Sequence, residues 1–142
     1  MDQRVSLITL GARDIDGLAA FYDALGWQRT EVPDGVIAYD LLGQTLGLYP
    51  IEKLAEDIGV EVDSLGHGAA TLGCNVRTRE EVAQVLAAVK HAGGKVLKSA
   101  SDVFWGGHHG YFADPEGHIW EVAFNPFSPL REDGAFRWNG YG

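Results

Sequence analysis

The sequence contains a single cysteine, Cys74, so no disulfide bond can form within the chain. One thiol also excludes a zinc site built from several cysteines, because structural zinc normally takes four Cys or His ligands. No apolar run approaches 18 residues, and no basic segment precedes an apolar one at the N-terminus. The sequence therefore shows neither a membrane span nor a signal peptide, and we expect a cytoplasmic protein.

Basic residues are also few. Eleven Lys and Arg face 20 Asp and Glu, which gives a formal net charge of −9. This charge argues against nucleic acid or an anionic membrane as a partner and is compatible with cationic or neutral small ligands. The length of 142 residues and the hydrophobic content of 46% fit one compact domain with a core of its own.

Residues 112–124 organise the second half of the chain, because they read as strand, tight turn and strand. Pro115 suits the second position of a turn, and Gly117 can take the positive φ that closes it. Glu121 interrupts an otherwise apolar strand. A carboxylate at this position must face solvent, a partner charge, a metal or a ligand cavity, since unpaired burial would cost several kcal/mol.

The first half of the chain predicts the order βαβββ. Asp14 offers an N-cap to a helix, and Gly26 ends it. Turn residues at 33–35 and 43–44 separate the strands that follow. We expect strands at 4–10, 27–32, 36–42 and 45–49, a short acidic helix at 51–58 and a linker at 59–68.

The second half repeats this order. Thr78 and Glu81 have the spacing of a capping box, which predicts a helix after them. A shift of 64 residues places Leu7 on Thr71, and this agreement of pattern indicates an internal repeat. The expected strands are 69–76, 95–98 and the two strands of the 112–124 hairpin, and residues 103–105 either continue the 95–98 strand or add to it. The apolar face of the helix is Val82, Val85, Leu86 and Val89.

These motifs resemble a known family. The helix motif Ala20-Phe21-Tyr22, the following Leu25-Gly26-Trp27, and the 114–118 turn that leads into Trp120-Glu121 are similar to the vicinal-oxygen-chelate superfamily. That superfamily includes glyoxalase I, extradiol dioxygenases, fosfomycin-resistance enzymes and bleomycin-binding proteins. The resemblance covers residues 4–126. It is specific for the fold but not for the reaction.

The resemblance implies an α+β fold in which two tandem βαβββ modules form a cupped, eight-stranded mixed sheet. A single domain would span residues 1–128, with module one at 4–58, the linker at 59–68 and module two at 69–126. A C-terminal tail would follow at 129–142. Relatives of this kind commonly form dimers, so we also expect a homodimer, with the modules either swapped or unswapped.

In the metal-dependent members of that superfamily, the ligand positions correspond to Leu7, Gly47, Thr71 and Glu121 here. Leu7 and Gly47 carry no side-chain donor, and Thr71 offers only a hydroxyl. A catalytic divalent site normally needs about three protein donors such as His and carboxylates. We therefore expect neither the usual metal site nor another cofactor. A divalent metal held by Glu121 and a histidine is the alternative.

A cup without a metal still offers a polar and aromatic ligand site, in which Glu121 is the candidate general base or ligand anchor. His108 and His109 are adjacent, so at most one of them faces the cup, and we expect His118 at the surface. A plain core position is the alternative for Tyr39 and Trp105. The candidate ligand-binding residues are Thr9, Tyr39, Thr71, Asn75, Trp105, His108 and His109.

The sequence thus predicts a small-molecule-binding protein, with ligand binding or metal-free proton transfer centred on Glu121. One alternative is a metal-dependent glyoxalase-type lyase or dioxygenase with a rearranged metal site, and another is sequestration of a cationic drug. The pattern does not name the ligand or decide whether the protein is an enzyme. Phe136, Trp138 and Tyr141 in the tail are expected to dock at the dimer interface, the alternative being a loosely ordered terminus.

Overall fold

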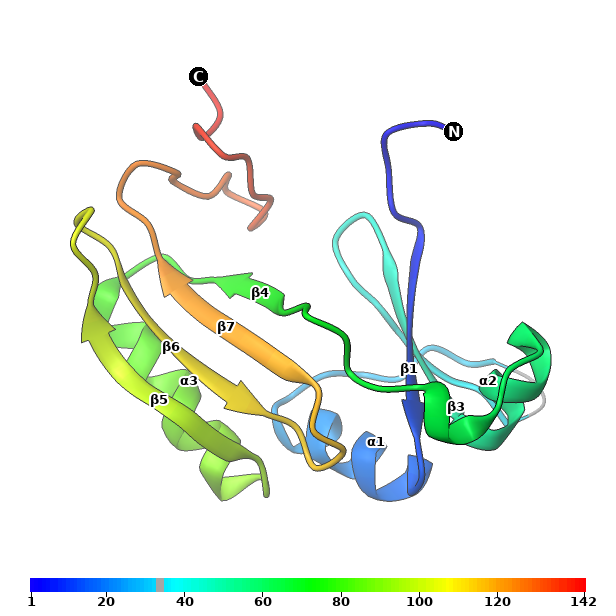
Figure 1. Cartoon of the computed structure of the whole chain (residues 1–142). Coiled ribbons are helices and arrows are strands. Elements are labelled where there is room, and N and C mark those ends of the chain that lie inside the picture. The colour runs from blue at the N-terminus through cyan, green and yellow to red at the C-terminus, as the bar shows by residue number, and fades with distance from the viewer. Residues whose placement is uncertain (33–34) are drawn as a thin grey trace. The chain divides into compact units, whose positions relative to one another are not determined.

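A computed structural model describes residues 1–32 and 35–142 (Figure 1). They form two compact units, Met1–Gly68 (unit 1) and Ala69–Gly142 (unit 2). Each unit combines one mixed sheet with helices, so the expected α+β class is confirmed. The expected eight-stranded sheet is not confirmed, because the described residues form one sheet of three strands and one of four. None of their helices is both long and apolar enough to cross a membrane.

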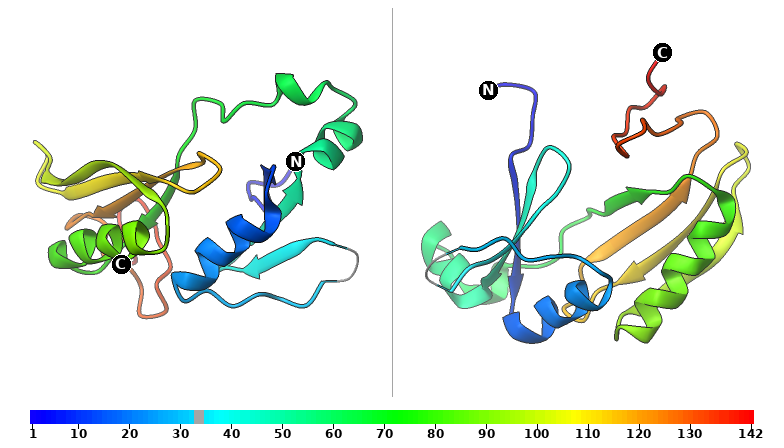
Figure 2. Two further views of the ribbon diagram at one scale, coloured as in Figure 1. Left: turned by 90° about the horizontal axis from the view of Figure 1, so that it is seen from below. Right: turned by 180° about the vertical axis from the view of Figure 1, so that it is seen from behind.

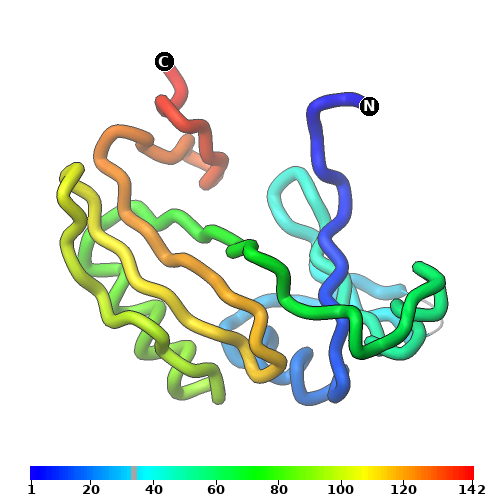
Figure 3. The backbone as a smooth tube through the Cα atoms, viewed as in Figure 1, coloured from blue at the N-terminus to red at the C-terminus, as the bar shows by residue number. Residues whose placement is uncertain are grey.

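The sheet of unit 1 has the strand order β1-β3-β2, in which β1 runs parallel to β3 and β2 runs antiparallel to it. Figure 3 traces this path from the N-terminus. The elements are β1 (Leu7–Ala12), α1 (Ile15–Ala24), β2 (Ile37–Asp40), β3 (Thr45–Pro50), α2 (Ile51–Ile58) and the 3-10 helix η1 (Val62–Ser64).

Helix α1 covers one face of this sheet. Its expected N-cap is confirmed, because the Asp14 carboxylate accepts a hydrogen bond of 2.9 Å from the Gly17 backbone N–H. The buried side of α1 includes Leu18 and Phe21, and the facing β3 side chains Leu46 and Leu48 are fully buried. Burial of such side chains contributes about 1.5–3 kcal/mol each, which holds α1 on the sheet.

The strand expected at 27–32 is wrong. Only a single bridge between Thr30 and Ala38 forms there. The Trp27 ring instead stacks on Tyr22, with 5.2 Å between ring centroids, and the Arg29 guanidinium pairs with Asp23 at 2.8 Å. These contacts hold the segment against α1 by its side chains. The expected turn at 33–35 lies partly outside the described residues, since positions 33 and 34 are not described.

The sheet of unit 2 has the order β4-β7-β6-β5, with β4 parallel to β7 and the other pairs antiparallel. Helix α3 lies along one face of it, as the view from behind in Figure 2 shows. The face of this sheet away from α3 is called the uncovered face below. The elements are β4 (Leu72–Asn75), α3 (Arg79–His91), β5 (Lys95–Asp102), β6 (His108–Ala113) and β7 (Ile119–Phe124).

The start of α3 differs from the expected capping box. The Thr78 side chain makes no capping hydrogen bond, whereas the Glu81 carboxylate accepts one of 3.0 Å from the Arg77 backbone N–H. The expected apolar face is buried at Val82, Leu86 and Val89. Residues 103–105 are a turn and not the expected strand, because Gly106 takes a φ of 101° and its N–H bonds to the Val103 carbonyl.

The turn between β6 and β7 is confirmed, and a buried carboxylate organises it. Asp114 is 3% exposed and accepts hydrogen bonds of 3.0 Å from the backbone N–H groups of Glu116 and His118. His118 Nδ1 lies 2.7 Å from the same carboxylate, so His118 is partly buried and not at the surface as expected. Gly117 closes the turn with a φ of 91°. This turn fixes the register of β7 and thereby the position of Glu121.

The tail after β7 is held to unit 2 by side-chain contacts. The Arg77 guanidinium donates to the carbonyls of Arg131 and Glu132 at 3.1 and 2.7 Å. The buried hydroxyl of Ser128 donates to the Trp138 carbonyl. The tail therefore follows a defined path although it contains no regular strand or helix.

Candidate functional site

The uncovered face of the unit 2 sheet carries a group of polar side chains. Alternation along each strand and the register of the sheet bring them together, because Tyr111 pairs with both Glu121 on β7 and Lys98 on β5. His109 lies two residues before Tyr111 on β6 and therefore on the same face. We call these four residues, Lys98, His109, Tyr111 and Glu121, the Glu121 cluster.

Hydrogen bonds connect the members of this cluster. The Tyr111 hydroxyl donates to Glu121 Oε2 at 2.6 Å, and His109 Nδ1 lies 3.0 Å from the same oxygen. Lys98 Nζ lies 3.4 Å from His109 Nε2. The side chains of His109 and Glu121 are 13% and 31% exposed, so the cluster is partly shielded and still open to a ligand. The neighbours of the Glu121 carboxylate on this face are thus polar.

The electrostatics of the cluster follow from these contacts. The hydrogen bond to Glu121 raises the pKa of Tyr111 to about 12, with burial and the negative charge of Glu121 adding to it. Tyr111 is therefore a neutral donor at ordinary pH. If His109 donates its Nδ1 proton to Glu121, the lone pair of Nε2 is left to accept from Lys98 or from a ligand. The cluster thus holds a carboxylate, an imidazole and an ammonium group within reach of one another.

Besides Thr9, which is described below with the pocket of unit 1, three of the predicted site residues lie elsewhere. His108 points away from the uncovered face: its Nδ1 lies 2.8 Å from Asp102 and 3.4 Å from Arg79 of α3. Trp105 is in the β5–β6 turn, where its ring lies over Gly107. Tyr39 is a core residue at 1% exposure, and its hydroxyl donates to the Ala19 carbonyl at 3.0 Å.

The two predicted residues on or beside β4 border the uncovered face. Thr71 is exposed and directly precedes β4, while Asn75 ends β4 at the level of Ala123. Between them, Gly73 is level with Glu121, and a side chain there would meet no other atom within 4 Å. The missing side chain therefore leaves open space beside Glu121. Sequence reasoning missed Gly73, Lys98 and Tyr111, although the spacing of two residues from His109 to Tyr111 indicates a shared face.

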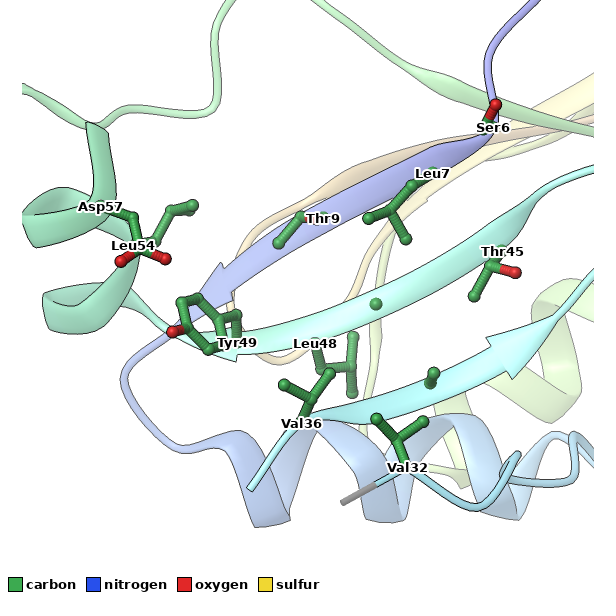
Figure 4. A pocket seen from close by; sticks show the side chains of 12 residues that line it. Ser6, Leu7, Thr9, Val32, Val36, Thr45, Leu48, Tyr49, Leu54 and Asp57 are labelled. Carbon is green, nitrogen blue, oxygen red and sulfur yellow. The ribbon is translucent and has the colours of Figure 1, made fainter. Parts of the chain in front are cut away.

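Unit 1 contains a pocket of about 560 Å³ on the sheet face away from α1 (Figure 4). Gly47 on β3 forms part of its floor, and α2 borders it with Leu54 and Asp57. Thr9, one of the predicted site residues, lies in this pocket. The described lining residues are Ser6, Leu7, Thr9, Val32, Val36, Ala38, Thr45, Gly47, Leu48, Tyr49, Leu54 and Asp57.

The four family ligand positions do not present a donor set that fits a divalent metal. In unit 1, a Cβ atom at Gly47 would lie 3.5 Å from Leu7 Cδ1, so these two positions are neighbours. Neither has a side-chain atom that can coordinate a metal. In unit 2, Thr71 offers a hydroxyl and Glu121 a carboxylate. Among residues 1–32 and 35–142, no group of three or more His, Cys, Asp or Glu side chains is placed to hold a metal ion.

The family model of the Glyoxalase/Bleomycin resistance protein/Dioxygenase superfamily matches residues 4–122. The chain belongs to this superfamily. A solved structure of a glyoxalase-related enzyme from Fulvimarina pelagi is 38% identical, with 97% of this chain and 99% of that chain covered and a TM-score of 0.88. The comparison with curated proteins gives no match.

More distant superfamily structures share the fold. A superfamily enzyme from Burkholderia phytofirmans is 21% identical with a TM-score of 0.73, covering 84% of this chain and 96% of that one. A lactoylglutathione lyase from Agrobacterium tumefaciens is 18% identical with a TM-score of 0.66, covering 88% and 96%. At these identities the likeness shows the fold alone. The family match over residues 4–122 and the structure from Fulvimarina pelagi confirm the resemblance drawn from the helix and turn motifs.

Proposed function

We propose that the protein binds a small molecule at the Glu121 cluster and that proton transfer there needs no metal at the family positions. The observation that supports this most is the pair of contacts on Glu121 Oε2, from Tyr111 and from His109. Together they hold a carboxylate on a sheet face beside an open position at Gly73. A few converging polar groups that orient a ligand are one feature of small-molecule sites.

The residues suit one simple proton transfer. A weakly acidic ligand gives its proton to His109 Nε2, and the imidazolium that forms is paired with the Glu121 carboxylate. The ligand becomes an anion, and the Lys98 ammonium group, close to His109, can stabilise that charge. Tyr111 keeps Glu121 oriented toward His109 throughout, because its hydroxyl stays protonated.

The variant Glu121→Gln tests this proposal. Ligands are first found by screening a library of small polar compounds against the wild-type protein with NMR, selecting those that shift the signals of His109 and Tyr111. Glu121→Gln should weaken their binding at least about fivefold, because it removes the charge that pairs with the imidazolium. Thermal unfolding should change little, since the Gln amide oxygen can still accept from Tyr111.

The matched control is Glu80→Gln, which makes the same chemical change at an exposed residue of α3. It should leave both binding and stability unchanged. A Glu121→Gln protein that is strongly destabilised but binds the same compounds equally well would make Glu121 a structural residue instead.

Metal content tests the second half of the proposal. The protein is purified without a histidine tag, and its metal content is measured by inductively coupled plasma mass spectrometry. We expect divalent metal well below one equivalent, because the four family positions supply only one strong donor. One equivalent of bound metal that is lost in Glu121→Gln would instead support a rearranged metal site.

A further inference from the structure

The pocket of unit 1 has an uneven distribution of charge. Its floor and walls are mostly apolar, with the hydroxyl groups of Ser6, Thr9 and Thr45 as uncharged polar groups. Asp57 is the only acidic residue among its described lining residues, and none of these is Lys, Arg or His. The carboxylate therefore has no cationic counterpart within the described lining of the pocket.

Tyr49 lies at the same end of the pocket as Asp57 (Figure 4). Burial raises the pKa of Tyr49, and the charge of Asp57 and its hydrogen bond with the phenol raise it further. This end thus combines a carboxylate with the aromatic ring of a neutral phenol. Carboxylates and aromatic faces are the two side-chain features that attract organic ammonium groups.

The rest of the pocket lining is suited to an apolar body. Gly47 carries no side chain, and Leu7, Val32 and Val36 surround the space above the sheet. A volume of about 560 Å³ lies in the range of pockets that hold small organic molecules.

We propose that this pocket binds an organic cation, with its ammonium group against Asp57 and Tyr49 and its apolar body over Gly47. The inference rests on the proposed binding of small molecules and adds to it the chemical class of a ligand. It uses residues of unit 1 only, so it can fail while the proposal for the Glu121 cluster stands.

Three indole compounds of the same ring and similar length test the class of ligand: tryptamine is a cation at pH 7, tryptophol is neutral and indole-3-acetate is an anion. Dissociation constants measured by NMR titration should rise in that order. The step from tryptamine to tryptophol should be about two- to fivefold, the range for a partly exposed ion pair. In Asp57→Asn this preference should disappear, while tryptophol should bind as before.

Two further variants locate the site. Glu52→Gln removes an equal charge from α2 at a residue outside the pocket lining and should keep the preference for tryptamine. Gly47→Val places a side chain in the pocket, where its Cβ would meet Leu7 Cδ1 at 3.5 Å and Thr9 Oγ1 at 3.9 Å. These are ordinary contact distances, so the fold should tolerate the change, and binding of all three compounds should fall at least about tenfold.

The outcomes separate the two proposals. Equal binding of tryptamine and tryptophol by the wild type would overturn the cationic class and leave small-molecule binding intact. Unchanged binding in Gly47→Val, with the fold intact by circular dichroism, would overturn the location. Failure of all three compounds to bind the wild type at millimolar concentration would overturn the inference as a whole, whereas the Glu121 cluster is judged separately by Glu121→Gln.

Discussion

A single carboxylate oxygen, Glu121 Oε2, connects a phenol and an imidazole on the uncovered face of unit 2. This shared acceptor determines how Tyr111 titrates. Its pKa of about 12 lies above the ordinary value of 10.0, so the folded state keeps the proton at a pH where the unfolded chain has lost it. The stability that this group contributes is present below about pH 10 and is lost as the pH rises toward about 12.

We predict that Glu121→Gln moves the Tyr111 pKa back toward 10, because the variant lacks the charge that opposes ionisation. Titration of ¹³Cζ-labelled tyrosine by NMR measures it. Tyr39 provides an internal control, since burial is the main cause of its pKa of about 12 and the variant should not change it. An unchanged Tyr111 titration would show that Glu121 does not set this pKa.

The contact between His109 and Glu121 predicts a tautomer. Neutral His109 should carry its proton on Nδ1, because that nitrogen lies 3.0 Å from Glu121 Oε2 while Nε2 faces the Lys98 ammonium group, which can only donate. The ¹⁵N chemical shifts of labelled histidine distinguish the two tautomers. In Lys98→Met the Nδ1 tautomer should persist, as Glu121 remains in place. A predominant Nε2–H tautomer in the wild type would refute the arrangement.

At the scale of single residues, the sequence indicated Glu121 as a candidate site residue, because a carboxylate in an apolar strand is costly to bury without a partner. It also indicated that at most one of His108 and His109 faces the site, although not which one. Tyr111 was missed although its spacing from His109 indicates a shared face, whereas Lys98 could not be found, because its approach to His109 depends on the pairing of β5 with β6. That register shifts twice between Val96 and Ser101, and such irregularities leave no clear pattern in a sequence.

At the scale of elements, the β6–β7 turn depends on one buried side chain. Asp114 is buried and satisfies two backbone N–H groups as well as His118. Asp114→Ala should lower the free energy of unfolding by about 2–4 kcal/mol, because it leaves these donors without their acceptor. Urea unfolding followed by circular dichroism measures the change.

Asp114→Asn provides the graded comparison for this turn. Its amide oxygen can still accept from the backbone N–H groups of Glu116 and His118 but lacks the charge, so about half of the loss is expected. Equal stability of Asp114→Ala and the wild type would show that the turn is held by Gly117 and the strand pairing alone.

Helices were predicted better than strands. The expected helix at 51–58 matches α2, and Asp14 caps α1 as expected, because capping residues and helical periodicity are local signals. The strand expected at 27–32 failed because Trp27 and Arg29 find their partners on α1. The strand expected at 103–105 failed because Gly106 favours a turn. Both outcomes depend on tertiary contacts or backbone conformation that apolar alternation alone does not reveal.

For the whole molecule, the tail predicts assembly. Phe136, Trp138 and Tyr141 are 42%, 77% and 38% exposed, although Arg77 and Ser128 hold the tail in a defined path. Large aromatic side chains that are ordered and exposed are typical of interface residues. We predict a homodimer in solution whose interface includes Trp138 and Phe136.

Replacing both Phe136 and Trp138 by Ser should raise the dissociation constant of this dimer at least about tenfold. Sedimentation equilibrium measures it. Leu42→Ser, which changes an exposed apolar residue of unit 1, should have no effect. A monomeric wild type at high concentration would refute the prediction.

The repeated order of elements also let the sequence predict the family and the fold class. Each half shows a strand and a helix followed by further strands, and this pattern survives although few residues are identical. The number of strands was overestimated, because residues 27–32 form no strand in the first sheet. Their side chains contact α1 instead. The relation of the pocket lining to α2 could not be foreseen, because it depends on how α2 turns back over β1 and β3.

The strand orders β1-β3-β2 and β4-β7-β6-β5 have a consequence for synthesis on the ribosome. In unit 2, β4 is the first strand to be made and, among the strands of the described residues, pairs with β7 alone, which is made last. Until β7 has emerged, the backbone groups of β4 have no strand to bond with, whereas β5 and β6 can already form a hairpin. The strands of the unit 1 sheet are all available once β3 has emerged. A nascent chain that stops before β7 therefore carries one finished sheet and one unpaired strand, which makes it prone to aggregation.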